Sequence, residues 1–173
     1  ENYKHLGLKK VPKLLESLDR AILFDEILKG SDWQYLRPRN DSMRYFEDLK
    51  SLISLLKRER ITAKDFSAAV KKEIKFLERD EASLSSRGET KGELKKEVLK
   101  KIESLEKSGE VVKFIELYEA TKKEKNLFDY DDVLESLVEL VENSKETLAQ
   151  IHERYLFVLV DEHQDSSRVQ NEF

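Results

Sequence analysis

The chain has 173 residues, of which 39% are charged, and it contains five glycines, two prolines and no cysteine. A chain of this length can bury a core as one domain, and its few helix-breaking residues favour a mainly helical fold. The absence of cysteine excludes a disulfide framework and a thiolate metal site. No apolar run reaches the roughly 20 residues of a membrane span, and the first residues lack a signal-peptide pattern. We therefore expect a soluble, cytoplasmic protein.

The charge is unevenly distributed along the chain. Residues 126–173 hold 12 acidic and 3 basic side chains, a net charge of −9, whereas residues 1–125 carry a net charge of +5. This asymmetry indicates either two regions with different roles or simply helix surfaces of mixed charge.

The first predicted helix starts near Leu18, with Ser17 as its cap and Gly30 as its stop. Helical spacing predicts a mainly apolar face made of Leu18, Ala21, Ile22, Asp25 and Leu28. The stretch "SDWQYLRPRN" then reads as a loop because Pro38 disfavours helix at the residue before it. Trp33 and Tyr35 are expected to pack this loop onto the core, and a base-stacking role is the alternative.

Two further helices follow. The first, within 43–60, has Asp41 or Ser42 as its cap and buries Met43, Phe46, Leu49, Ile53 and Leu56. Thr62 and Asp65 form a predicted capping box at the start of the next helix, which runs from Ala63 to about Arg79.

Residues 80–93 are small and polar and predict the tip of a helical hairpin. A long helical pattern follows from Leu94 to about residue 125, with a break or kink possible at Gly109. The helices on either side of the tip are expected to fold back as an antiparallel arm.

Asp129 is the predicted cap of the first of two helices that end near Arg154. The pattern then changes to "LFVLV" at 156–160, which is apolar at every position, as in a strand buried on both faces of a parallel sheet. Asp161 and Glu162 follow at its carboxyl end, where ligands bind in α/β sheets. An apolar strand that ends in Asp-Glu is the Walker B arrangement, in which carboxylates bind Mg²⁺ and activate a water molecule.

The segment "VDEHQDSSRVQ" resembles motif II of UvrD/Rep/PcrA-type superfamily 1 DNA helicases, with Asp161, Glu162, Gln164, Asp165, Ser166 and Gln170 at the matching positions. The segment "NLFDYDDVL" at 126–134 resembles a second family segment, at a matching distance upstream. Residues 1–125 resemble the helical 1B subdomain of that family more weakly. The glycine-rich phosphate loop and the later arginine-bearing motifs of the family do not occur in the sequence.

The resemblance implies residue roles. Asp161 and Glu162 would hold Mg²⁺, Glu162 would be the catalytic base of ATP hydrolysis, and Gln164 and Asp165 would connect the nucleotide site to neighbouring motifs. It also implies contacts with single-stranded or forked DNA. The leading candidates are Arg37, Arg39, Arg44, Lys57, Arg58 and Arg60, followed by Lys71, Lys72, Lys75, Lys95, Lys96, Lys100 and Lys101. Interleaved acids indicate that many of these lysines serve only helix stability.

We therefore expect a mainly α protein, a helical bundle with a projecting hairpin and one C-terminal strand excised from a parallel α/β ATPase core. Residues 1–153 would form a 1B-type subdomain, and residues 154–173 the strand and motif II edge of the ATPase core. The chain would be a segment of an ATP-dependent DNA helicase, unable to bind or hydrolyse ATP by itself and able to self-associate through its exposed strand. The alternatives are a helical interaction module and a helicase-like subunit of a recombination nuclease.

Overall fold

The computed structural model describes residues 6–37, 43–86 and 91–172. This part of the chain contains seven α-helices and two very short strands, so the prediction of a mainly helical fold is confirmed. The elements in chain order are β1 (Lys13–Leu14), α1 (Ser17–Lys29), α2 (Phe46–Arg58), α3 (Ala63–Arg79), the 3-10 turn η2 (Glu81–Ser83), α4 (Lys96–Lys125), β2 (Leu127–Phe128), α5 (Tyr130–Asn143), α6 (Lys145–Arg154), the 3-10 turn η3 (His163–Asp165) and α7 (Arg168–Asn171).

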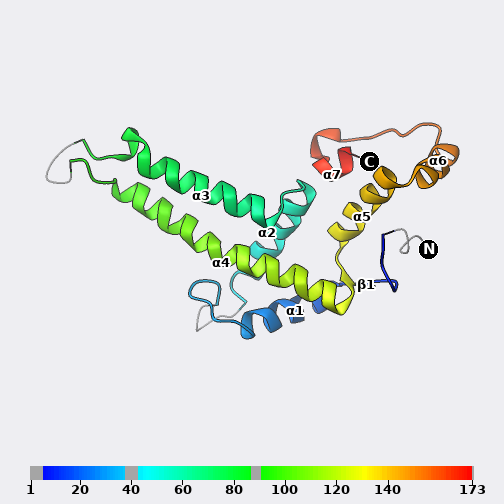
Figure 1. Ribbon diagram of the computed structural model, residues 1–173, viewed down its shortest axis with the longest axis horizontal. Helices are drawn as coiled ribbons and strands as arrows, with labels where there is room; N and C mark the ends of the chain where they lie inside the picture. The colour runs from blue at the N-terminus through cyan, green and yellow to red at the C-terminus, as the bar shows by residue number, and fades with distance from the viewer. Residues whose placement is uncertain (1–5, 38–42, 87–90, 173) are drawn as a thin grey trace.

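A long antiparallel hairpin of α3 and α4 projects from the rest of the molecule (Figure 1). The predicted capping box starts α3, because the Thr62 hydroxyl accepts a hydrogen bond from the Asp65 N–H at 3.1 Å while the Asp65 carboxylate accepts one from the Thr62 N–H. The turn η2 and an antiparallel bridge between Leu84 and Leu94 close the outer end of the hairpin. The predicted arm is confirmed, and the described residues of the stretch 80–93 lie at its outer end.

Helix α4 spans 30 residues without a break at Gly109. A Cβ added to Gly109 would have no neighbouring atom within 4 Å, so this glycine answers no packing requirement of the helix. The neighbouring residues of α4 provide enough helical hydrogen bonding and packing to absorb the roughly 1 kcal/mol that glycine costs.

The core lies where α1, α2 and the second half of α4 meet. Phe24 is its centre: its ring makes edge-to-face contacts with Phe46, Phe114 and Tyr118 at centroid distances of 5.1, 4.8 and 5.2 Å. The predicted buried stripe of α2 is confirmed at Leu49, Ile53 and Leu56, three members of this cluster.

The predicted apolar face of α1 is confirmed at Leu28 but was wrong at Leu18 and Ile22. Leu18 and Ile22 are exposed, whereas the buried residues are Leu23, Phe24, Ile27 and Leu28. This helix carries apolar side chains on more than one side, and the aromatic contacts of Phe24 select the side that faces α2 and α4. The predicted Ser17 cap was also wrong: Ser17 lies inside the helix, and Glu16 precedes it without a side-chain cap bond.

The loop before α2 is held against α4. Trp33 packs against Phe114 with a centroid distance of 6.0 Å, which confirms its predicted packing role. The Glu110 carboxylate accepts backbone N–H bonds from Gln34, Tyr35 and Leu36, the last two at 2.9 and 3.0 Å. Helix α2 begins at Phe46, and the predicted caps Asp41 and Ser42 lie outside the described residues.

The predicted C-terminal strand at 156–160 was wrong. These residues follow α6 as an exposed segment with no strand pairing, and Leu159 is 96% exposed. A strand needs a partner for its backbone groups, and the described residues offer none to this segment. The only strands in this part of the chain are β1 and β2, which pair in parallel with Lys13 opposite Leu127. After the exposed segment the chain returns, and α7 packs against α2 and α5 (Figure 1).

No helix among the described residues combines the length and apolar character that crossing a membrane requires.

Candidate functional site

Residues 161–165, which match the first part of motif II, form one exposed turn between the segment 156–160 and α7, whereas Ser166 is half-buried and Gln170 lies in α7. The Asp161 carboxylate accepts a hydrogen bond from the Glu162 N–H at 2.9 Å, and the Gln164 amide donates to the Glu162 carboxylate. Glu162 has a φ of 49°, in the left-handed region that costs a residue with a side chain roughly 1–2 kcal/mol. The turn thus brings Asp161, Glu162 and Gln164 together, and the nearby Asp165 is also exposed.

The donor set of this turn fits a magnesium ion. Mg²⁺ prefers oxygen ligands and keeps several waters, so one or two exposed carboxylates suit it. Asp161 and Glu162 offer such oxygens, and neither carboxylate is engaged with a lysine or arginine among the described contacts.

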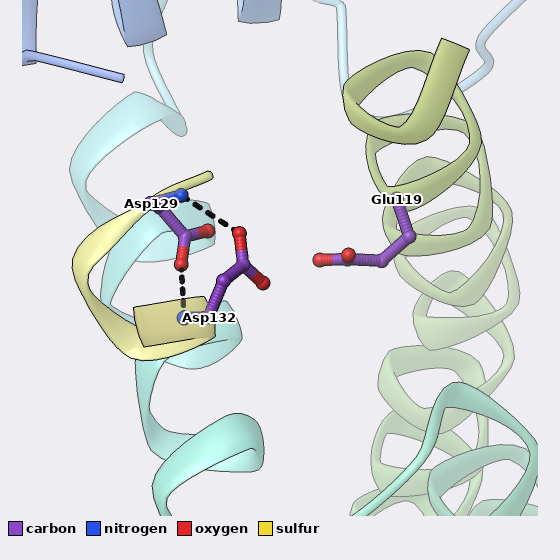
Figure 2. A group of neighbouring side chains, drawn as sticks. All are labelled: Glu119, Asp129 and Asp132. Carbon is purple, nitrogen blue, oxygen red and sulfur yellow. Dashed lines mark hydrogen bonds between the residues drawn. The ribbon is translucent and has the colours of Figure 1, made fainter. Parts of the chain in front are cut away.

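A second cluster, of charged residues and one tyrosine, lies where α2, α4 and α5 meet, and all of it except Glu119 is largely buried. We call it the junction cluster, and it consists of Lys57, Tyr118, Glu119, Lys122, Asp129 and Asp132. Lys57 comes from the last turn of α2, and Lys122 comes from the last turn of α4. Asp129 and Asp132 belong to the family-like segment and form the capping box of α5, with hydrogen bonds of 2.9 and 2.7 Å (Figure 2). The predicted cap at Asp129 is therefore confirmed.

Asp129 is the centre of the junction cluster. One of its carboxylate oxygens, Oδ2, accepts from Lys57 Nζ at 2.9 Å, from Lys122 Nζ at 2.9 Å and from the Tyr118 hydroxyl at 3.1 Å. The side chains of Asp129 and Lys122 are each only 2% exposed. Since burial of an unpaired charge is costly, these ion pairs are a condition for packing the three helices together.

The pKa values in the cluster follow from these contacts. Burial alone would raise the pKa of Asp129, but the ammonium groups of Lys57 and Lys122 lower it well below its usual value. Burial alone would lower the pKa of Lys57, but Glu119, Asp129 and Asp132 raise it. Burial, with a further contribution from Asp129, raises the pKa of Tyr118. Lys57 and Asp129 are therefore both held in their charged forms, whereas Tyr118 stays neutral.

The three carboxylates of this cluster also converge as metal ligands would. Oxygens of Glu119, Asp129 and Asp132 lie within 4.8 Å of one another, and Figure 2 shows Glu119 facing the two aspartates from α4. However, Lys57 and Lys122 each form ion pairs with all three acids. A divalent ion would have to displace both ammonium groups, so the cluster fits internal ion pairing better than metal binding.

The structure also shows what surrounds the predicted DNA-contacting residues. Lys57 belongs to the junction cluster. Arg58 pairs with Asp131 at 3.2 Å, and Arg60 pairs with Glu142 at 3.2 Å and with Glu172. This group on α2 and in the turn after it therefore holds the acidic C-terminal part of the chain.

The other predicted DNA contacts have different surroundings. Arg37 and Arg44 are exposed, and Arg39 lies outside the described residues. The predicted lysines of the arm are all exposed; Lys101 pairs with Glu73 across the two helices at 2.7 Å, and Lys95 donates to the carbonyl of Ala82. The described part of the predicted DNA surface is therefore split between residues engaged inside the fold and residues open to solvent.

Sequence reasoning missed Glu110, Tyr118, Glu119 and Lys122 as organising residues. The capping pattern Asp129-x-x-Asp132 was visible, but the lysines that neutralise it come from two other helices. Such a cluster is a tertiary contact, and periodicity within one helix carries no signal for it.

The comparisons with known proteins agree with the motif. The whole chain, residues 1–173, matches the family described as the UvrD/REP helicase N-terminal domain. A helical arm followed by a motif II turn thus places the molecule in a class of helicase domains, and the chain belongs to the UvrD/REP helicase family.

Three relatives share short stretches with the chain. An ATP-dependent helicase/nuclease subunit from Natranaerobius thermophilus is 36% identical over 61 residues, which is 35% of this chain and 5% of that protein. The exonuclease/helicase subunit RexA of Streptococcus pneumoniae is 33% identical over 57 residues, 33% of this chain and 5% of that protein. A Bacillus subtilis protein named as a putative ATP-dependent DNA helicase, YjcD, is 38% identical over 61 residues, 35% of this chain and 8% of that protein. The matched stretches thus span less than a tenth of each relative.

Proposed function

We propose that this chain works as part of an ATP-dependent DNA helicase of the cytoplasm, in which residues 1–153 contact DNA and residues 154–173 contribute one edge of the ATPase site. The observation that carries the proposal is the turn "DEHQD" directly after an exposed apolar segment. Five consecutive apolar side chains at 156–160 are exposed. Apolar side chains at every position are typical of a segment that is covered on both faces, and an ATPase core would supply that cover.

In this proposal Asp161 and Glu162 provide the carboxylates of the nucleotide site. Both side chains end in carboxylate oxygens, which can only accept hydrogen bonds, and both lie on an exposed turn. Mg²⁺ bound with ATP neutralises phosphate charge, and Asp161 would hold it together with Glu162. Glu162 would also accept the proton of the attacking water, while Gln164, which already donates to the Glu162 carboxylate, would fix its orientation.

The test of the nucleotide role compares the chain alone with the longer protein that contains it. Phosphoryl transfer requires a phosphate cradle, which the sequence lacks, so the 173-residue chain should show no ATP binding by calorimetry and no hydrolysis. In the longer protein, Glu162→Gln should abolish hydrolysis and retain nucleotide binding, because Asp161 remains. Hydrolysis by the chain alone that disappears with Glu162→Gln would contradict the proposal.

The DNA role is supported by the net charge of +5 over residues 1–125 and by the exposed arginines and arm lysines. We expect weak, sequence-independent binding whose affinity falls as salt rises. A titration at about 50 mM salt with single-stranded and forked DNA measures it. Because Lys57 is buried, the variant to test is Lys71→Glu/Lys72→Glu/Lys75→Glu on the exposed arm, which should bind DNA more weakly. Unchanged affinity of this variant for DNA would show that the arm does not contact DNA.

A helicase-like subunit of a nuclease is the second candidate. Two of the relatives described above are named as helicase/nuclease or exonuclease/helicase subunits. The same motif II turn would serve in either protein. Co-purification of the longer protein with a nuclease partner distinguishes this candidate from a free-standing helicase.

The exposed segment 156–160 also supports self-association of the chain when its sheet partners are missing. Light scattering should report less association after removal of residues 155–173, and unchanged scattering would contradict this part of the proposal.

A further inference from the structure

A small cavity between the loop before α2 and the middle of α4 is lined by two tyrosines. Its volume is about 230 Å³, and its walls include Tyr35, Tyr45, Leu52, Val111 and Lys107. Most drug-sized ligand sites span roughly 300–1,000 Å³, so this cavity suits a single flat ring system.

Both tyrosines have a cation beside them. The Lys107 ammonium lies over the Tyr35 ring, 5.1 Å from its centroid, and the Arg44 guanidinium lies over the Tyr45 ring at 5.6 Å. The Glu103 carboxylate is the main cause that raises the pKa of Lys107, and Tyr35 and Tyr45 add to the effect. Each tyrosine ring at the cavity thus has one cation over it.

Helix α4 fixes the position of Tyr35. The Tyr35 N–H donates to Glu110 Oε2 at 2.9 Å, and Glu110 lies one turn beyond Lys107 on the same helix. This bond holds Tyr35 at the cavity, and 36% of the residue remains exposed.

The acidic residues around the cavity do not prevent an anion such as a phosphate from binding there. Asp48 contributes to its wall, and Glu103 pairs with Lys107 at 2.8 Å. That pair is exposed, with the Lys107 and Glu103 side chains 41% and 60% accessible, and exposed pairs are worth at most about 1 kcal/mol. Lys107 can therefore exchange Glu103 for a phosphate.

We propose that this cavity, which we call the Tyr35 cavity, is a stacking subsite for one unpaired base of single-stranded DNA, with Tyr35 and Tyr45 offering ring faces and Lys107 and Arg44 meeting the adjoining phosphates. Base-aromatic stacking needs no hydrogen-bond readout, so the subsite is sequence-tolerant. The inference rests on the proposed function, because it assumes that residues 1–153 contact DNA. It adds a base contact to the phosphate contacts that the exposed arm lysines would make.

The first experiment uses the unaltered 173-residue chain. Fluorescence anisotropy at about 50 mM salt compares oligothymidylate of about 16 nucleotides with an abasic oligonucleotide of equal length and charge. The abasic strand should bind at least about fivefold more weakly. Equal affinity for the two strands would overturn the stacking subsite, since both offer the same phosphates.

Variants of the chain then locate the effect. Tyr35→Leu and Tyr45→Leu should each remove the preference for bases and leave duplex binding unchanged, because paired bases are not free to stack. Tyr130→Leu is the matched control, since Tyr130 is 71% exposed and lies elsewhere. Equal losses of affinity for single-stranded and duplex DNA would show that the tyrosines act only by stabilising the fold. Melting of each variant, followed by circular dichroism, shows separately whether the fold is intact.

Lys107→Gln tests the phosphate contact separately. The slope of log affinity against log salt on single strands should fall by about 0.7. Lys123→Gln, at an exposed position near the other end of α4, should leave the preference for bases intact. If the chain binds no DNA, the proposed DNA role fails together with this subsite; if DNA binds but the abasic and tyrosine comparisons show no difference, only the subsite fails.

Discussion

Replacement of Lys122 by methionine tests how much the junction cluster contributes to the free energy of unfolding. Methionine keeps most of the aliphatic stem and removes the ammonium group. In the native chain this group donates to Asp129 at 2.9 Å and to Asp132 at 2.6 Å, and the lysine side chain is 2% exposed. The substitution leaves Lys57 alone to balance Glu119 and the two aspartates.

We expect a large loss of stability. Removal of one partner from a buried ion pair typically costs about 3–5 kcal/mol, because the remaining charge stays buried without compensation. For a chain of this size that loss corresponds to a fall in melting temperature of roughly 6–20 °C. Urea unfolding followed by circular dichroism measures it, with the midpoint shifted and the slope unchanged.

Lys125→Met is the matched control. Lys125 lies three residues further along α4 and pairs with Glu26 at 2.6 Å, but its side chain is 42% exposed. Exposed pairs contribute about 0–1 kcal/mol, so this variant should remain close to the native chain.

A double variant separates the ion pair from other effects. Asp129→Asn retains a good helix cap and removes the charge that Lys122 meets. The double variant Lys122→Met/Asp129→Asn should therefore be less destabilised than the sum of the two single variants, by about 0.5–3 kcal/mol. Additive losses, or a loss below about 1 kcal/mol for Lys122→Met, would refute the reasoning about the junction cluster.

Three further predictions concern the rest of the fold. Gly109→Ala should raise the free energy of unfolding by about 0.5–1 kcal/mol in urea, because the new methyl group meets no atom within 4 Å and alanine suits a helix; a loss would contradict the continuous α4. Burial alone would raise the pKa of Glu110, but the backbone N–H bonds that it accepts lower the pKa overall. The stability that these bonds give the fold is therefore present above the ordinary pKa of 4.5 and is lost as the pH falls below it. Glu110→Gln should make stability less dependent on pH in this range, as followed by the fluorescence of Trp33. The pKa of Lys57 and that of Tyr118 are raised, so the folded state binds more protons at high pH; unfolding in urea should become easier above about pH 10, and a flat profile there would contradict their burial.

The sequence predicts the arm well because its signals are local. The capping residues Thr62 and Asp65, the polar stretch 80–93 and the apolar period of α4 are all readable within one segment, and the structure agrees with each of them. Helix α1 shows the limit of such signals. Its apolar residues cover several sides, so only the packing of Phe24 against Phe114 and Tyr118 decides which side is buried.

The C-terminal segment shows the converse case. Residues 156–160 have the composition of a buried strand, yet composition alone supplies no hydrogen-bond partners, and the segment is exposed in the structure. Asp161 and Glu162 are predicted as site residues from a short contiguous motif, a signal that the sequence carries by itself. The junction cluster was not predicted, because its members are brought together from three helices.

The charge asymmetry of the sequence has a structural explanation at the boundary between α2 and the C-terminal elements. The basic residues Lys57, Arg58 and Arg60 all pair with acids from residues 129–172. Basic charge at and just after the end of α2 therefore pairs with acidic charge on α5 and at Glu172, just after α7, and holds these elements together. A phosphate that engaged Lys57 would have to break buried ion pairs, whereas the arm lysines and the cations beside the Tyr35 cavity can meet phosphates with the fold intact. The proposed DNA-contacting charge therefore lies on the arm and around the Tyr35 cavity, whereas Lys57, Arg58 and Arg60 hold the end of α2 against α5 and the residues that follow it.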